Sequence, residues 1–230
     1  MPVTRIVAEA GSCHLNSLPT AKKLIDAAAD AGAWAVKFQW LDEGSVESGN
    51  NAGIFIPEKW IPRLKAHADK QGVELFFSCF GVPAIIEWKM GVLARDGIKY
   101  MKFAFPQRHL HNLHDLSYDL FKETFISHSP MDLLPDHPTL RRLYCHSVHG
   151  QAVYPVETWL DWEGIFPPFH GFSDHSKGKM QAIQALIQGA TILEKHIRLD
   201  DTPMSIPDAR IAIPPSVLSE ICEHARLPNV

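Results

Sequence analysis

The stretch that decides the fold begins with Gly171-Phe-Ser-Asp-His175 and continues, beyond a helical segment, to Ile192-Leu-Glu-Lys-His196. Each of these two runs is typical of a buried strand that ends in a histidine. Residues 177–188 between them carry alanine, isoleucine and leucine on one broad face, which predicts a helix. A strand, helix, strand unit brings both strand ends to the same side of a sheet. We therefore expect His175 and His196 to lie close together, where two imidazoles could hold a divalent metal ion.

The rest of the chain repeats this alternation of strands and helices. A segment at 128–139 holds three prolines, so any helix there is short. Eight strands separated mostly by helices are what a closed parallel (β/α)8 TIM barrel requires. An open doubly wound sheet also fits the chain length, and periodicity alone does not decide between them. The predicted strands are 5–10, 34–39, 74–78, 98–103, 124–127, 140–145, 169–173 and 191–196; the predicted helices are 17–31, 57–71, 83–94, 109–122, 159–165, 177–188 and 214–225.

Composition indicates one domain spanning residues 1–230. The chain is 46% hydrophobic and 21% charged, which is enough apolar surface to bury a substantial core. Its formal charge of -4, with interspersed signs, gives no reason to expect nucleic acid or an anionic membrane as a partner. The N-terminus lacks a signal-peptide core and no apolar run reaches spanning length. Four widely separated cysteines fit a reducing compartment, so we expect a soluble, cytoplasmic protein.

Two lysines stand out among the residues at the predicted strand ends, where a barrel of this type places its chemistry. Lys37 and Lys102 each lie inside an apolar strand, so each points into the barrel mouth or breaks the core pattern. Two lysines that converge there would form a binding site for a phosphate or a carboxylate. Alternatively, each could reach solvent or pair with Glu9 or Glu194.

Five short motifs follow one another along almost the whole chain: Ile6-Val-Ala-Glu-Ala-Gly-Ser-Cys-His14, Ala35-Val-Lys-Phe-Gln39, Gly171-Phe-Ser-Asp-His-Ser-Lys-Gly178, Gly189-Ala-Thr-Ile-Leu-Glu-Lys-His196 and Pro207-Asp208. In this order they resemble the signatures of the N-acetylneuraminate (sialic acid) synthase family. The resemblance implies a (β/α)8 barrel that condenses phosphoenolpyruvate with the open-chain aldehyde of an N-acylated hexosamine. The products would be a 3-deoxy-2-keto acid and phosphate, in surface-polysaccharide or related carbohydrate biosynthesis. The resemblance covers the barrel domain alone, and we expect the family's C-terminal antifreeze-like domain to be absent. The assembly that we expect, if the chain associates, is a homodimer.

The resemblance also implies a metal site. By alignment with the family, His175 and His196 would hold Mn²⁺ or Mg²⁺, which polarises the aldehyde oxygen. Asp174 and Glu194 stand next to these ligands and would orient the imidazoles. His146 follows the sixth strand directly and is a candidate third ligand or acid/base group.

The other implied site residues act on the two substrates. Lys37, Lys102 and Ser173 would bind phosphoenolpyruvate. The residues that would face the sugar are Glu9, Gln39, Tyr154 and Asp208. The predicted catalytic residues are Glu9, Lys37, Lys102 and Gln107, and the predicted substrate-binding residues are Gln39, Ser78, Tyr154, Ser173 and Asp208.

The segment after the fourth strand departs from the family pattern Lys-Ile-Ala-Ser-Gly-Glu. Here the chain reads Lys102-Phe-Ala-Phe-Pro-Gln107. Phe105 replaces a phosphate-binding hydroxyl, and Gln107 replaces an acid by an amide that cannot shuttle a proton at neutral pH. Two alternatives therefore stand beside the condensation: a metal-dependent lyase or aldolase acting on a different keto acid, and a degenerate barrel that binds a sugar without turnover.

Overall fold

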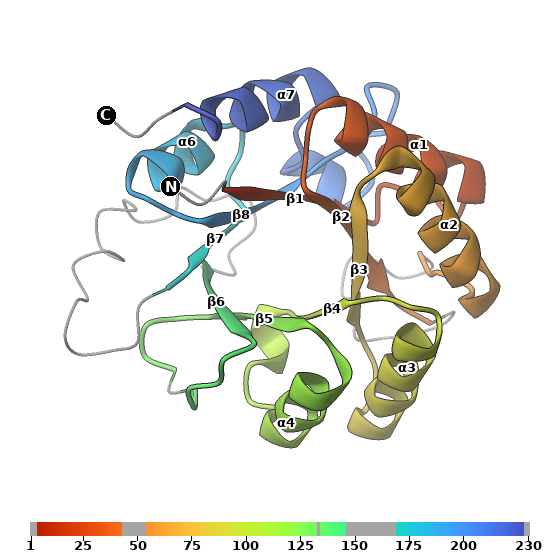
Figure 1. Ribbon diagram of the computed structural model, residues 1–230. Coiled ribbons are helices and arrows are strands. Elements are labelled where there is room, and N and C mark those ends of the chain that lie inside the picture. Colours follow the sequence, from red (N-terminus) through yellow and green to blue (C-terminus); the bar gives the residue numbers. More distant parts are fainter. Residues whose placement is uncertain (1–3, 43–53, 133, 146–168, 228–230) are drawn as a thin grey trace.

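The protein forms a closed parallel barrel. The computed structural model describes residues 4–42, 54–132, 134–145 and 169–227, to which all structural statements refer. Within them, eight strands follow one another around the ring in chain order, and the last pairs with the first. Figure 1 shows this ring with the helices outside it. The predicted (β/α)8 barrel is confirmed, and the open doubly wound sheet is excluded.

The elements lie within a few residues of their predicted positions. Residues 129–132 and 134–139 contain no helix, as the prolines there indicate. The predicted helix at 159–165 lies outside the described residues. The strands are β1 (Arg5–Gly11), β2 (Ala35–Trp40), β3 (Glu74–Cys79), β4 (Tyr100–Phe103), β5 (Glu123–His128), β6 (Leu140–Cys145), β7 (Gly171–Asp174) and β8 (Ile192–His196). The helices are α1 (Leu18–Asp30), α2 (Ile61–Gln71), α3 (Pro83–Arg95), α4 (His111–Leu120), α6 (Met180–Ile187) and α7 (Pro215–His224), with short 3-10 turns η2 (Glu58–Trp60), η3 (Phe105–Gln107) and η4 (Asp208–Arg210).

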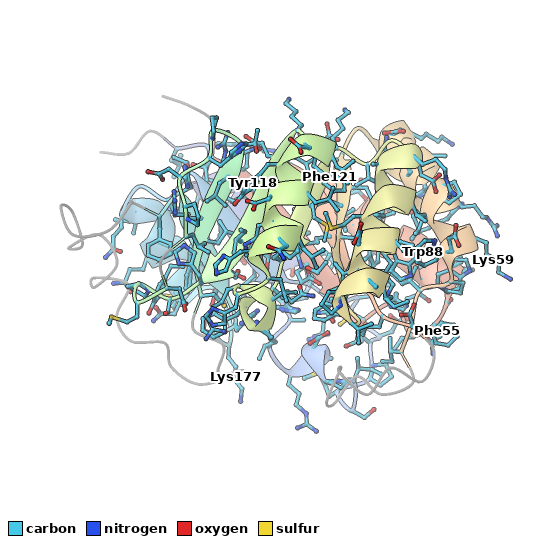
Figure 2. All side chains as sticks on the ribbon, turned by 90° about the horizontal axis from the view of Figure 1, so that it is seen from below. Phe55, Lys59, Trp88, Tyr118, Phe121 and Lys177 are labelled. Atoms are coloured by element: carbon cyan, nitrogen blue, oxygen red, sulfur yellow. The ribbon has the colours of Figure 1, made fainter. Side chains whose placement is uncertain are left out.

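Local sequence signals set the ends of the first helices. The hydroxyl of Ser17 accepts a hydrogen bond from the backbone N–H of Thr20 and so caps α1. Gly72 ends α2 in the left-handed conformation, with φ of 74°, which a residue without Cβ adopts readily. The helices pack on the outside of the barrel, and the side view in Figure 2 shows the half-exposed Trp88 beside the yellow helix α3. In the described part of the chain, no helix has the length and apolarity needed to span a membrane.

An aromatic layer fills the lower half of the barrel, towards the N-terminal ends of the strands. The rings of Phe76 and Phe125 stack with their centroids 5.3 Å apart, and Trp34 meets Tyr100 edge-on at 5.0 Å. The guanidinium carbon of Arg5 lies 4.7 Å from the Trp34 ring centroid and 5.5 Å from that of Phe125 on β5. Side chains of β1 and β5 stand on opposite sides of the ring, so their contact here shows that the interior is filled rather than open.

An ion cluster closes this lower end below the aromatic rings. Glu123, at the start of β5, pairs with both Arg5 of β1 and Arg141 of β6. The carboxylate is mostly buried, with 12% of its side chain exposed. The ion cluster and the aromatic rings therefore fill the barrel interior at this end.

Gly171 is required where β7 meets β8. A Cβ atom at this position would lie 1.8 Å from the backbone oxygen of Ile192. We expect Gly171→Ala to lower the free energy of unfolding by about 2–3 kcal/mol, because two paired strands must separate to admit one methyl group. Urea denaturation measures this loss. Gly91→Ala is the matched control: Gly91 lies in α3 with nothing within 4 Å of its added Cβ, so this change is expected to stabilise by roughly 0.5–1 kcal/mol. Equal effects of the two changes would contradict the prediction.

Candidate active site at the C-terminal end of the barrel

A polar layer lies above the aromatic rings, with one residue from each strand. Alternation along the strands turns these side chains inward, and none is more than 3% exposed. Six of the eight are among the site residues predicted from the sequence; Ser127 and Cys145 are not. The layer consists of Glu9, Lys37, Ser78, Lys102, Ser127, Cys145, Ser173 and Glu194.

Glu194 is the centre of this layer. Its carboxylate accepts hydrogen bonds from the Lys102 ammonium at 3.1 and 3.2 Å, across the ring from β4 to β8. The hydroxyl of Ser173 donates to the same carboxylate at 2.7 Å. The Lys37 ammonium lies 3.9 Å from it. The two lysines therefore converge on one carboxylate inside the barrel mouth.

Lys37 also pairs with Glu9 of the neighbouring strand and donates a hydrogen bond to the Ser78 hydroxyl at 2.9 Å. The second oxygen of Glu9 accepts the backbone N–H of Gly11 at 2.9 Å. Of the interpretations offered for the two lysines, reaching solvent is wrong. Pairing with Glu9 and Glu194 is correct, and this pairing gathers both lysines at the mouth.

Burial and ion pairing shift the pKa values of Glu9 and Glu194 in opposite directions. Burial raises the pKa of Glu9 from 4.5 to about 7, although Lys37 opposes the shift. Burial acts on Glu194 in the same direction, but Lys102 and Lys37 outweigh it and hold the pKa of Glu194 well below its usual range. Burial also lowers the pKa of Lys102, against the pull of Glu194. The pKa of Glu9 therefore lies near neutral pH, whereas the lowered pKa of Glu194 keeps this carboxylate ionised.

Two imidazoles form the rim above this layer. The rings of His175 and His196 lie with their centroids 5.2 Å apart and tilted by 50°, which confirms that the two strand ends meet. The Cys145 sulfur lies 3.6 Å from Nδ1 of His175. Two neighbouring imidazoles fit a divalent ion such as Mn²⁺. Within the described ranges no group of three His, Cys, Asp or Glu side chains is arranged to hold a metal; His146, the candidate third ligand, lies outside these ranges.

Asp208 of η4 stands beside this rim. One of its carboxylate oxygens accepts two hydrogen bonds from Ser12, from the backbone N–H and from the hydroxyl, each 2.7 Å long. Gly11 lies directly beneath, with φ of 46°. A Cβ there would be 2.4 Å from this oxygen and 3.3 Å from Nδ1 of His196. Glycine thus allows the Asp208 carboxylate, predicted to face the sugar, to sit next to a predicted metal ligand.

Gln107 is held by the backbone. Its amide nitrogen donates to the carbonyl of Cys79 at 2.6 Å, and its amide oxygen accepts the N–H of Ala104 at 3.0 Å. These contacts tie the end of β3 to the turn after β4. The ring of Phe105 stacks against the Arg108 guanidinium at 4.1 Å. The contacts described for Gln107 explain a structural role, and its catalytic role stays a prediction.

Four predicted residues remain, two of which the structure describes. Asp174 was predicted to orient an imidazole, but its two oxygens accept hydrogen bonds from Lys195 and from the backbone of Ser176. Gln39 is half-buried next to Ser78 in the β2–β3 register. His146 and Tyr154 lie outside the described residues.

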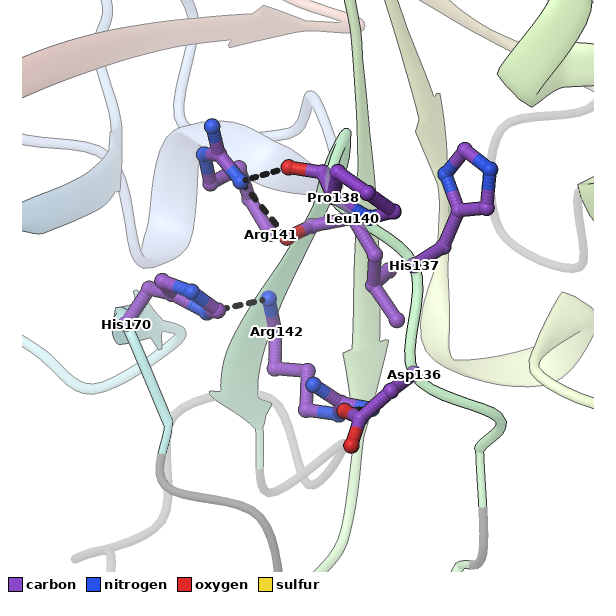
Figure 3. A pocket seen from close by; sticks show the side chains of 7 residues that line it. All are labelled: Asp136, His137, Pro138, Leu140, Arg141, Arg142 and His170. Atoms are coloured by element: carbon purple, nitrogen blue, oxygen red, sulfur yellow. Dashed lines mark hydrogen bonds and ion pairs between the residues drawn. The ribbon is translucent and has the colours of Figure 1, made fainter.

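A cavity of about 690 Å³ opens near the other end of the barrel, where β6 and β7 begin (Figure 3). Its cationic groups already have internal partners: Arg141 donates to the carbonyls of Pro138 and Leu140 and pairs with Glu123. Arg142 pairs with Asp136. This cavity lies away from the polar layer and the imidazoles, so the candidate site is the C-terminal mouth.

The chain is similar to known proteins over most of its length. Residues 159–229 match the model of the NeuB family. The chain is 27% identical to N,N'-diacetyllegionaminic acid synthase of Campylobacter jejuni, over 98% of this chain and 76% of that protein. It is 28% identical to the spore coat polysaccharide biosynthesis protein SpsE of Bacillus subtilis, over 96% of this chain and 66% of that protein. The chain thus spans about two thirds to three quarters of these relatives.

The fold is likewise similar to a solved synthase structure. The N-acetylneuraminic acid (sialic acid) synthetase of Leptospira borgpetersenii, in complex with citrate, superposes with a TM-score of 0.78 at 25% identity, over 98% of this chain and 83% of that one. The resemblance to the N-acetylneuraminate synthase family that the sequence motifs indicate is therefore confirmed, both along the sequence and in the fold.

Proposed function

We propose that this protein condenses phosphoenolpyruvate with the aldehyde form of an N-acyl hexosamine-like sugar, forming a 3-deoxy-2-keto acid and releasing phosphate. The observation that carries this proposal is the buried polar layer, in which two lysines, two carboxylates and three hydroxyls meet below two imidazoles. The names of the relatives, which include synthases of legionaminic and pseudaminic acid, point to the same class of reaction.

Lys37 and Lys102 are the groups that would hold phosphoenolpyruvate. Its carboxylate and phosphate are both anionic, and buried ammonium groups bind such anions strongly. Ser78 and Ser173 already hydrogen-bond within this cluster and can turn their hydroxyl groups towards the same anion. The polar layer therefore offers both charge and directed donors to one substrate.

Glu9 would take up a proton when such an anionic substrate binds. With its pKa near 7, Glu9 is partly protonated at neutral pH. An incoming anion favours the neutral carboxyl further, because it would otherwise face a like charge. When Glu9 is protonated, two ammonium groups face the single carboxylate of Glu194. Binding of the anion and uptake of a proton at Glu9 then support each other, in a site whose Gln107 cannot carry a proton.

His175 and His196 would hold Mn²⁺ or Mg²⁺. An ion held there would act as a Lewis acid on the aldehyde oxygen of the sugar. Asp208 lies next to His196 and is positioned to accept a hydrogen bond from a sugar hydroxyl. A homodimer and a cytoplasmic location remain expectations from the sequence.

The test is release of phosphate from phosphoenolpyruvate in the presence of Mn²⁺ and a panel of N-acyl aldoses. We expect phosphate only when both substrates are present, and a new 3-deoxy-2-keto acid in equal amount. Cleavage of a keto acid without phosphoenolpyruvate would favour the lyase or aldolase alternative instead.

His175→Ala separates catalysis from simple binding. We expect this variant to lose Mn²⁺-dependent turnover while it retains affinity for phosphoenolpyruvate, because the lysines that bind the anion are unchanged. Binding of a sugar by both proteins, with no turnover by either, would overturn the proposal in favour of a non-catalytic barrel.

A further inference from the structure

A second buried ion pair lies on the outer face of β7 and β8. Lys195 donates to the Asp174 carboxylate at 2.9 Å, and neither side chain has any exposed surface. The two residues are register partners in the sheet. They face away from Ser173 and Glu194, because successive side chains of a strand point to opposite faces. This pair is therefore separate from the polar layer inside the barrel.

Such a pair needs an explanation in this position. Removing two charges from water is costly, and well-packed apolar residues of similar volume are often as stable or more stable. The neighbouring outward residues, Phe172 and Leu193, are apolar and fully buried. Stability alone is therefore a weak reason for a lysine and an aspartate between the sheet and its helices.

The further contacts of the pair are with the backbone that flanks His175 in sequence. The Lys195 ammonium also donates to the carbonyl oxygen of Ser176 at 2.5 Å. The second oxygen of Asp174 accepts the backbone N–H of Ser176 at 2.8 Å. Asp174 precedes His175 and Ser176 follows it, so the backbone is fastened on both sides of this histidine. Lys195 itself precedes His196, so one ion pair links the segments that carry both imidazoles.

We propose that Lys195, paired with Asp174, is a positioning residue that fixes the backbone around His175 and thereby sets its imidazole against that of His196. The inference rests on the proposed function in one respect: it assumes that His175 and His196 bind a metal ion. Lys195 acts through its contacts with Asp174 and Ser176.

The test compares Lys195→Met with the double variant Asp174→Leu/Lys195→Met. The single change leaves a buried carboxylate without its partner, so both stability and Mn²⁺ affinity should fall. The double change restores an apolar pair, and stability should recover. Affinity for Mn²⁺, measured from the electron paramagnetic resonance of the free ion, should stay about 10- to 100-fold weaker than in the wild type, as for other residues that support metal ligands. Recovery of affinity together with stability would overturn the proposal, since it would make the pair merely structural.

Lys89→Met is the matched control. Lys89 is also a fully buried lysine, and it donates to Asp42 and to the carbonyls of Trp40 and Phe80. We expect this variant to lose stability without losing Mn²⁺ affinity. A similar loss of affinity in Lys89→Met would show that general loosening of the barrel, not the fastening of His175, weakens the site.

A second readout keeps the inference distinct from the proposed function. Carbon–proton NMR correlations of the imidazoles in metal-free protein report ring position directly. In Lys195→Met the signals of His175 should shift and broaden, whereas those of His67, which pairs with Asp26 on the outside of the barrel, should not. If the wild type binds no Mn²⁺, the proposed metal chemistry fails, and unchanged His175 signals would then overturn the positioning role independently.

Discussion

Replacing Glu194 by glutamine is expected to lower the free energy of unfolding by about 3–5 kcal/mol at neutral pH, because one partner of a buried ion pair is removed. Glu194 is 3% exposed, and its carboxylate pairs with Lys102 at 3.1 Å and with Lys37 at 3.9 Å. Glutamine keeps the volume and can still accept from Ser173, but it supplies no charge. Two ammonium groups would then share the single carboxylate of Glu9. Thermal and urea denaturation measure the loss.

The same variant should gain unusual sensitivity to anions. Phosphate or phosphoenolpyruvate that binds between the lysines would supply the missing negative charge, and a ligand that binds only the native state stabilises it. We therefore expect phosphate to raise the melting temperature of Glu194→Gln more than that of the wild type. Leu24→Ala, which removes a fully buried leucine from α1, should lose about 2–5 kcal/mol without this added response. An equal phosphate response in the three proteins would show that the lysines do not form an anion site.

The second large effect is a dependence of stability on pH that originates in Glu9. Its pKa is about 7 in the folded protein, against 4.5 ordinarily. Between these values the folded state binds the proton more tightly than the unfolded state. The resulting stabilisation is fully present below about pH 4.5 and is lost as the pH rises through 7. A shift of this size corresponds to about 3 kcal/mol.

Glu9→Gln isolates this contribution. Burial lowers the pKa of His14, His114, His128 and His170 to about 4, so these groups make the protein more stable as the pH rises from about 4 to 6.5 and oppose the slope from Glu9. Their effects cancel in the difference between the two proteins. We expect the free energy of unfolding of Glu9→Gln, relative to the wild type, to increase by about 3 kcal/mol between about pH 5 and pH 8. A difference that does not change with pH would mean that Glu9 is ionised throughout.

The lysines and histidines that sequence reasoning located have one property in common: each is an unusual residue type for a buried strand. Lys37 and Lys102 interrupt apolar strands, and His175 and His196 end them. A buried charge is costly, so its presence in a strand is a visible signal of a partner. The barrel itself follows from the alternation of strands and helices, since parallel strands need crossovers of this kind.

Cys145 and Ser127 carry no comparable signal. Both are small residues that are ordinary in a core, and which face of the sheet they occupy depends on how strands pair. Cys145 lies opposite Ser173, and Ser127 opposite Leu143. A shift of one residue in either register would turn these side chains outward. Sequence alone does not provide that register, and for the same reason it could not show that Asp174 faces Lys195 rather than an imidazole.

The pairing of β8 with β1 also bears on the order in which the protein folds. Glu9 lies opposite His196, although nearly the whole chain separates them. Contacts of such long range form late, because closing a long loop costs entropy before any contact repays it. A chain in which only β1 to β4 have assembled contains Lys37, Lys102 and Glu9, but not Glu194. The strand that closes the ring is therefore also the one that balances the charge inside it, and the candidate site is complete only once this strand has paired.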